Sequence, residues 1–217
     1  MANLSPSFIT VTPPLPTVFT FRDHSATDAA GAVISASVNI GTATSTRLVI
    51  VLGGCGGNPG ITSVVAAGVT LTEVFNFAGT SGGYRFKAHA GLVTTGSGAQ
   101  TVESTWASGS GNYRCQSVWT IENPNSTVIK GTSSDLQYTI SCSLSVTAGD
   151  FIMALAQAGG GTPTWASSTE APSGERADSL FAGFTSAEWT VANTNASFGV
   201  TGTGTGSNAD GICVSYR

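Results

Sequence analysis

Four cysteines and two histidines carry the most reactive side chains of this 217-residue sequence. The cysteines are Cys55, Cys115, Cys142 and Cys213. They form no Cys-x-x-Cys pair, and neither histidine lies at metal-ligand spacing from any of them, so the sequence predicts no metal site and no cofactor. We expect mostly reduced thiols, because a chain of this length needs no disulfide to hold its core. Cys142 alternates with apolar residues, which indicates an inward-facing position on a strand.

Cys55 lies in a glycine-rich segment, residues 53–57, that directly follows an apolar run. A phosphate-binding loop at this place would need a Lys-Ser or Lys-Thr pair and a following helix, and the sequence contains neither signal. A nucleophilic cysteine would need a neighbouring base, and none flanks it. The segment is therefore predicted to be a flexible loop at one tip of the fold.

The two histidines suggest acid–base chemistry only weakly. His24 follows Asp23, and a distant serine would complete a triad, but the sequence contains no Gly-x-Ser-x-Gly elbow that would single out one serine. Asp23 and His24 are instead predicted to cap a turn after the first strand. His89 is expected to face solvent or a neighbouring strand.

The carboxylates are scattered along the chain. Glycoside hydrolysis needs two carboxylates across a sugar, and a calcium site needs a run of oxygen ligands, and neither constellation occurs here. The sequence thus predicts no catalytic residue, and we expect a protein that is not an enzyme. A glycan hydrolase or esterase is the weakest of the alternatives.

Tryptophan offers the best candidate for a binding surface. An exposed indole stacks on a sugar ring, and a surface of low charge suits neutral glycans. Trp165 and Trp189 are the candidate glycan contacts, and Trp165 lies between Pro163 and Ala166 close to a glycine run. Packing in the core is the alternative, above all for Trp119.

Charged residues are scarce, with 8 Lys and Arg and 12 Asp and Glu and a net charge of −4. This composition disfavours nucleic acid and an anionic membrane surface, because both bind through clustered cations. No run of about 18 apolar residues is present, so no membrane insertion is expected. The N-terminus contains neither the basic nor the apolar region of a signal peptide, and we expect a protein made in the cytoplasm.

Alternation of apolar and polar residues, separated by Gly, Asn, Ser and Pro clusters, predicts an all-β fold. The predicted fold is a single jelly-roll-like antiparallel β-sandwich of about twelve strands. The predicted strands are 18–21, 33–40, 47–52, 63–66, 69–77, 84–92, 101–106, 114–122, 136–146, 151–156, 179–184 and 212–217, with a further candidate at 196–201.

A proline-rich, extended arm is predicted over residues 1–16, ahead of one sandwich domain over 17–217. Such an arm either covers an edge of its own sheet or reaches a neighbouring subunit. The residues expected to make these contacts are Phe8, Ile9, Val11, Pro13, Pro14 and Pro16.

Several segments together resemble a family of β-sandwich proteins. They are TRLVIVL (46–52), ITSVVAAGVTLTEV (61–74), the strand at 84–92, SVWTIENPN (117–125), SLSVTAGDFIMALA (143–156) and GICVSYR (211–217). Their order is similar to that in accessory virion proteins of tailed bacteriophages and gene transfer agents, such as head fibres, capsid decorations and tail spikes. The resemblance implies a structural protein of the virion. Its partners would be copies of itself, the major capsid or tail protein, and host surface polysaccharide. The alternative is a stand-alone carbohydrate-binding module, secreted or at the cell surface.

Overall fold

The computed structural model describes residues 15–27, 33–56, 60–78, 84–107, 113–124, 129–136, 139–158, 164–167, 170–177, 183–203 and 209–216. Within these ranges it contains seventeen β-strands and no helix. All strand pairs are antiparallel. The predicted all-β, antiparallel sandwich class is therefore confirmed, while the jelly-roll connectivity stays a prediction.

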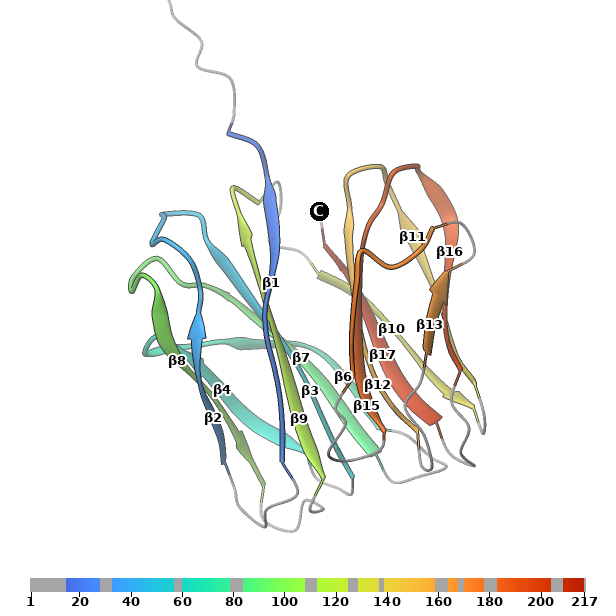
Figure 1. The fold of residues 1–217 in the computed structure, drawn as a ribbon, viewed down its shortest axis with the longest axis horizontal. Helices are drawn as coiled ribbons and strands as arrows, with labels where there is room; N and C mark the ends of the chain where they lie inside the picture. The colour runs from blue at the N-terminus through green and yellow to red at the C-terminus, as the bar shows by residue number, and fades with distance from the viewer. Residues whose placement is uncertain are drawn as a thin grey trace, which may run out of the picture.

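The strands form four sheets that pack as four successive layers (Figure 1). The inner N-terminal sheet contains β1 (Val18–Thr27), β9 (Arg114–Glu122), β3 (Leu48–Gly56), β7 (Tyr84–Leu92) and β6 (Thr72–Ala78), in this spatial order. The inner C-terminal sheet contains β10 (Ile129–Leu136), β17 (Ala209–Tyr216), β12 (Phe151–Ala158), β15 (Phe184–Thr190) and β14 (Gly174–Ala177). The outer N-terminal sheet contains β2 (Val33–Asn39), β8 (Ala99–Trp106), β4 (Ile61–Ala66) and β5 (Val69–Thr70). The outer C-terminal sheet contains β11 (Thr139–Val146), β16 (Asn195–Thr203) and β13 (Thr164–Ser167).

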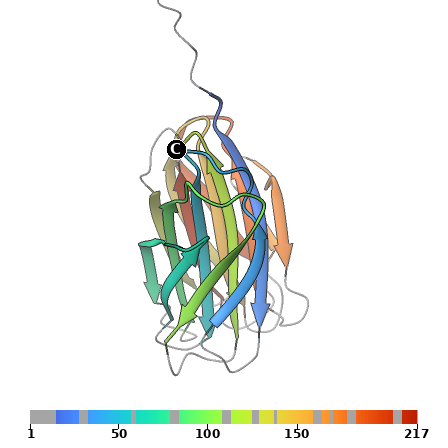
Figure 2. The same ribbon diagram turned by 90° about the vertical axis from the view of Figure 1, so that its left-hand side faces the viewer.

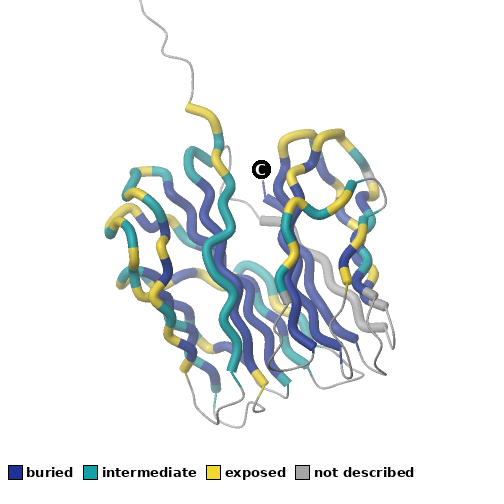
Figure 3. Tube along the Cα trace, viewed as in Figure 1, coloured by how far each residue is buried: buried dark blue, intermediate teal, exposed yellow. Residues whose placement is uncertain are grey.

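The layer of several strands follows from their sequence pattern. In β11, the apolar residues from Ile140 to Val146 are buried and the serines between them are exposed, as an outer sheet with one wet face requires. In β12 and in most of β3 every residue is buried, because the inner sheets are covered on both faces. Figure 3 shows this contrast, with buried residues concentrated in the two inner sheets.

Three hydrophobic cores separate the four layers. The N-terminal core, around Val51, Val64 and Trp106, lies between the outer and inner N-terminal sheets. The central core, around Ile50 and Leu155, lies between the two inner sheets. The C-terminal core lies between the inner and outer C-terminal sheets. Burial of apolar surface in these cores stabilises the packing of the layers, by about 25 cal/mol of free energy per Å² of apolar surface.

The two halves of the chain repeat one topology. The inner-sheet order β1-β9-β3-β7-β6 recurs as β10-β17-β12-β15-β14, and the outer-sheet order β2-β8-β4 recurs as β11-β16-β13. Among the strands of the described residues, only β5 has no counterpart. One hydrogen bond marks the correspondence residue by residue. Val93 N donates to Arg47 O at 2.9 Å, and Val191 N donates to Asp150 O at 2.8 Å. The described residues thus form two sandwiches of the same topology. The predicted division of the chain into an arm over residues 1–16 and one domain over 17–217 stays a prediction.

The two sandwiches face each other with an approximate two-fold relation. β3 packs on β12, β7 on β17, and β6 on β10. On the other side, β9 and β1 face β15 and β14, as the contacts of Trp119 with Glu188 and of Phe21 with Arg176 show. β3 therefore lies opposite its own counterpart, β12, and each of the other strands lies opposite the counterpart of the strand at the same distance on the far side of β3. The two-fold axis runs parallel to β3 and β12. Figure 2 shows that the strands of all layers run in roughly this direction.

Candidate functional site

The four tryptophans lie in the cores. Trp165 and Trp189, the candidate glycan contacts, are 6% and 0% exposed, and their rings meet edge to face with centroids 6.1 Å apart. Trp165 packs over Gly202, where an added Cβ would lie 3.2 Å from the indole, and its Nε1 donates to Thr185 Oγ1 at 3.1 Å. No free ring face remains on either residue, so the structure does not support the expected stacking on a sugar. Trp165 of the outer C-terminal sheet and Trp189 of the inner one both lie in the C-terminal core between these two sheets. The sequence alone did not reveal this burial.

The cysteines are also buried. Cys55 is fully buried within β3, which continues to Gly56. The prediction of a flexible loop over residues 53–57 is therefore wrong for residues 53–56, and Gly57 lies outside the described residues. The glycines here serve packing, since an added Cβ on Gly53 would lie 2.1 Å from Ile61 Cδ1. Cys142 and Cys213 are in hydrogen-bonding contact, and burial followed by this contact raises the pKa of Cys213. These thiols are shielded core residues, as predicted for Cys142.

His24 lies in β1 and joins the two sandwiches. β1 continues past a bulge to Thr27, so the predicted turn at Asp23 and His24 is wrong. His24 Nδ1 lies 2.7 Å from Ser117 Oγ and 3.4 Å from Ser186 Oγ on the opposite sheet. Ser117 and Ser186 are fully buried, so a substrate cannot reach the hydroxyls of this serine–histidine contact.

A charged group lies beside this histidine in the same seam between the inner sheets. Glu188 accepts a hydrogen bond from Trp119 Nε1 at 2.8 Å and pairs with Arg176 at 2.8 Å. The Arg176 guanidinium lies 3.8 Å from the centroid of the Phe21 ring. Because each member is contacted from the other half of the chain, the group fixes how the two sandwiches face each other.

His89 lies on β7 and is 2% exposed. It pairs with Glu73 of β6 and Val51 of β3, and its burial excludes solvent, the first of the two predicted alternatives. Burial lowers the pKa of His89 to about 4. Nearby, the hydrogen bond from Lys87 Nζ to Glu73 Oε2, 2.6 Å long, lowers the pKa of Glu73. This histidine is therefore neutral in the folded protein near pH 7.

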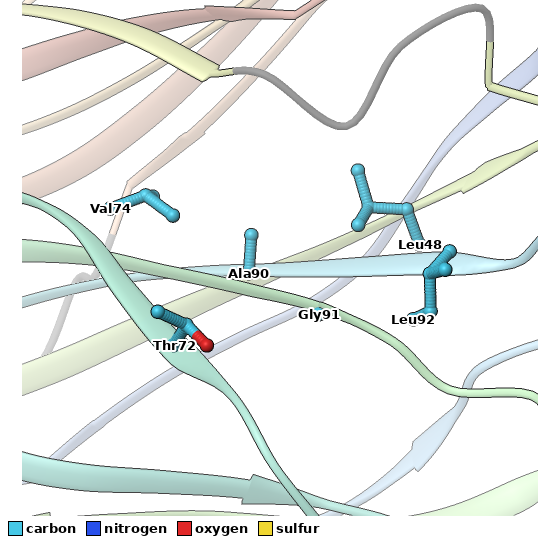
Figure 4. A pocket seen from close by; sticks show the side chains of 6 residues that line it. All are labelled: Leu48, Thr72, Val74, Ala90, Gly91 and Leu92. Carbon is cyan, nitrogen blue, oxygen red and sulfur yellow. The ribbon is translucent and has the colours of Figure 1, made fainter.

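A groove opens at one end of the inner N-terminal sheet, with a volume of about 380 Å³. It is lined by Leu48, Thr72, Val74, Ala90, Gly91 and Leu92 (Figure 4). Figure 4 shows Leu48, Val74 and Ala90 on one side of the sheet, and Leu92 at the rim is 44% exposed. An apolar lining with an exposed leucine is the chemistry of a site that binds an apolar side chain of a partner.

Sequence analysis did not single out this groove. The one signal was the run Ala88 to Gly91 in the predicted strand 84–92, where three of the four residues have small side chains. Small residues in such a strand mark either a close approach of another backbone or a hollow. The sequence cannot separate these two cases without knowing what faces the strand.

The base of the predicted arm lies at the same end of the same sheet. Pro16 O accepts a hydrogen bond from Asn123 Nδ2 at 3.1 Å, and Thr17 Oγ1 donates to Asn123 O at 2.8 Å. Leu15 and Val18 are 69% and 45% exposed. The other predicted arm contacts, Phe8, Ile9, Val11, Pro13 and Pro14, lie outside the described residues.

In the described part of the chain, no group of three or more His, Cys, Asp and Glu side chains is arranged to hold a metal ion. The same ranges contain no helix of the length and hydropathy that a membrane span requires. In the comparisons with known proteins, no family model and no curated protein sequence matches this chain.

Proposed function

We propose that this protein is a non-enzymatic structural protein of a phage-like particle, of the capsid decoration, head fibre or tail-associated type. It assembles with copies of itself and with the major capsid or tail protein. The proposal extends the family resemblance of the segments from residue 46 to residue 217.

The observation that carries the proposal is a pair of exposed apolar surfaces on one sheet. Leu15 and Val18 are exposed at the β1 edge of the inner N-terminal sheet, and the groove with Leu92 opens toward its β6 edge. Exposed apolar groups on a soluble chain mark contact surfaces. The few charges of the chain favour such contacts, because little charge must be desolvated when neutral surfaces meet.

The polar side chains of the inner-sheet seam support the same function. His24, Glu188 and Arg176 take part in the hydrogen bonds and the ion pair that stabilise the contact between the two sandwiches. A body of four closely packed layers, with hydrogen bonds and an ion pair in its central seam, suits a building block that must keep its shape in an assembly.

The test is co-sedimentation of the native protein with virus-sized particles from the producing cells. We expect the protein in the particle fraction at a fixed ratio to the major capsid or tail protein, retained after a high-salt wash. Recovery only as free protein would contradict the proposal. So would a hydrolytic turnover that a single Asp, Glu or Ser substitution abolishes.

A further inference from the structure

The groove has a filled counterpart in the other half of the molecule. It lies at the start of β3 and the end of β7, and the two-fold relation maps this place onto the start of β12 and the end of β15. There, Phe19 of β1 stacks on Phe151 of β12 with ring centroids 4.6 Å apart. Beside them, Phe21 meets Trp119 edge to face at 5.8 Å. Aromatic side chains thus occupy the counterpart of the groove.

Three positions at the groove have smaller residue types than the matching positions of its counterpart. Leu48 corresponds to Phe151, since Arg47 and Asp150 precede them and make the same hydrogen bond. Through the registers of β1 with β9 and of β10 with β17, Ile129 and Gly131 correspond to Phe19 and Phe21. At these register positions β1 has two phenylalanines, whereas β10 has an isoleucine and a glycine. The large aromatic residue types of the filled counterpart are therefore missing from the matching positions at the groove.

We propose that the groove binds the apolar segment Phe8–Val11 of the N-terminal arm of a second copy of this chain. The inference rests on the assembly function proposed above and names its contact. The segment contains Phe8, Ile9 and Val11, the side-chain types that fill the counterpart site. Seven residues separate Phe8 from Leu15, so an extended arm carries Phe8 up to about 24 Å from the edge of its own body.

The donor and the receptor lie on opposite edges of one sheet. The arm leaves at β1, and the groove is lined by β3, β7 and β6, two to four strand spacings or about 10–19 Å away. Pro13, Pro14 and Pro16 favour an extended, stiff base of the arm. A turn back across its own sheet is therefore disfavoured, which favours a neighbouring copy. Donor and receptor on opposite edges produce a head-to-tail contact, which closes into a ring or propagates.

Two full-length variants test this contact. Leu92→Glu puts a charge on the rim of the groove and leaves the arm unchanged. The double substitution Phe8→Ser with Ile9→Ser removes two apolar side chains from the arm and leaves the groove unchanged. Val33→Glu is the matched control, because Val33 is 45% exposed against 44% for Leu92 and lies on the outer N-terminal sheet. Light scattering after gel filtration reports the mass, and thermal unfolding confirms that each variant is folded.

We expect the wild type and Val33→Glu to associate, and each of the two site variants to associate at least about tenfold more weakly. A mixture of the two site variants should form a complex of two subunits of 21.8 kDa each, because one still donates an arm and the other still offers a groove. If the wild type is monomeric, or if the mixture forms no complex, the inference is overturned.

The failure of this inference is distinguishable from failure of the proposed function. Association of Leu92→Glu that equals that of the wild type would remove the groove as the receptor, while co-sedimentation with particles would still support assembly. Absence of the protein from particles, together with an intact head-to-tail contact in vitro, would contradict the proposed function and still support the contact between arm and groove.

Discussion

Arg47 is fully buried at one end of the N-terminal sandwich, and its replacement by methionine should lower stability markedly. Its guanidinium donates to five backbone carbonyl groups of the loops that connect β2 with β3 and β7 with β8. The distances are 3.0 Å to Val93, 3.4 Å to Ile40, 3.2 Å to Gly41, 2.6 Å to Thr95 and 2.8 Å to Gly96. Methionine retains much of the volume but none of the donors.

The three bonds of 3.0 Å or less carry most of the energy, at about 1 kcal/mol net each. The free energy of unfolding should therefore fall by about 3 kcal/mol. For a chain of this length the midpoint of thermal unfolding should fall by about 6–12 °C. Urea unfolding and calorimetry measure the two quantities.

Arg22→Met is the matched control. Arg22 has one hydrogen bond of 2.6 Å, to Thr120, and an ion pair of 3.9 Å with Glu122, so its replacement should cost about 1 kcal/mol. If Arg47→Met is no more destabilising than Arg22→Met, the carbonyl contacts of Arg47 do not hold the loops, and our account of this end of the fold is wrong.

Three further predictions concern the core. Glu188→Ala leaves Trp119 Nε1 and the partly buried Arg176 guanidinium without their acceptor. It should lower the free energy of unfolding, measured in urea, by about 3–5 kcal/mol, and Glu188→Gln should lower it by less. Equal losses for the two variants would count against a charged contact. The pKa of His89 is about 4 in the folded chain against 6.5 for the free side chain, so the unfolded state binds more protons between these two pH values. The free energy of unfolding should therefore fall as the pH drops from 6.5 to 4, by roughly 3 kcal/mol in all. Unfolding at several pH values should show this slope in the wild type and lose it in His89→Gln. Gly53→Ala places a Cβ 2.1 Å from Ile61 and should destabilise by about 1–3 kcal/mol, while Gly56→Ala, whose nearest contact would be 3.5 Å away, should be close to neutral.

The strands that alternate strictly or that are continuously apolar could be predicted from the sequence. The predicted strands 84–92 and 114–122 match β7 and β9 in both bounds, and 151–156 falls within β12. Short edge strands were missed, among them β13 and β14 with four residues each. Four residues contain too few repeats for alternation to be recognised, and pairing with β16 or β15 is what holds them extended. The predicted strand 179–184 lies mostly outside the described residues, and the observed strand β15 begins at its end.

By itself, the sequence determined the β class and the layer to which many strands belong, because period-2 alternation and burial on both faces are local properties of a strand. The tertiary structure decided which surfaces are covered. Trp165 lies beside a proline and a glycine run, as an exposed residue would, yet it is buried because β16 brings Gly202 beneath its ring. The groove at Leu48 and Ala90 likewise depends on what the opposing sheet brings to it, since the matching place in the other half is filled by Phe19 and Phe151. Burial and hollows are properties of two facing surfaces, and only the fold brings those surfaces together.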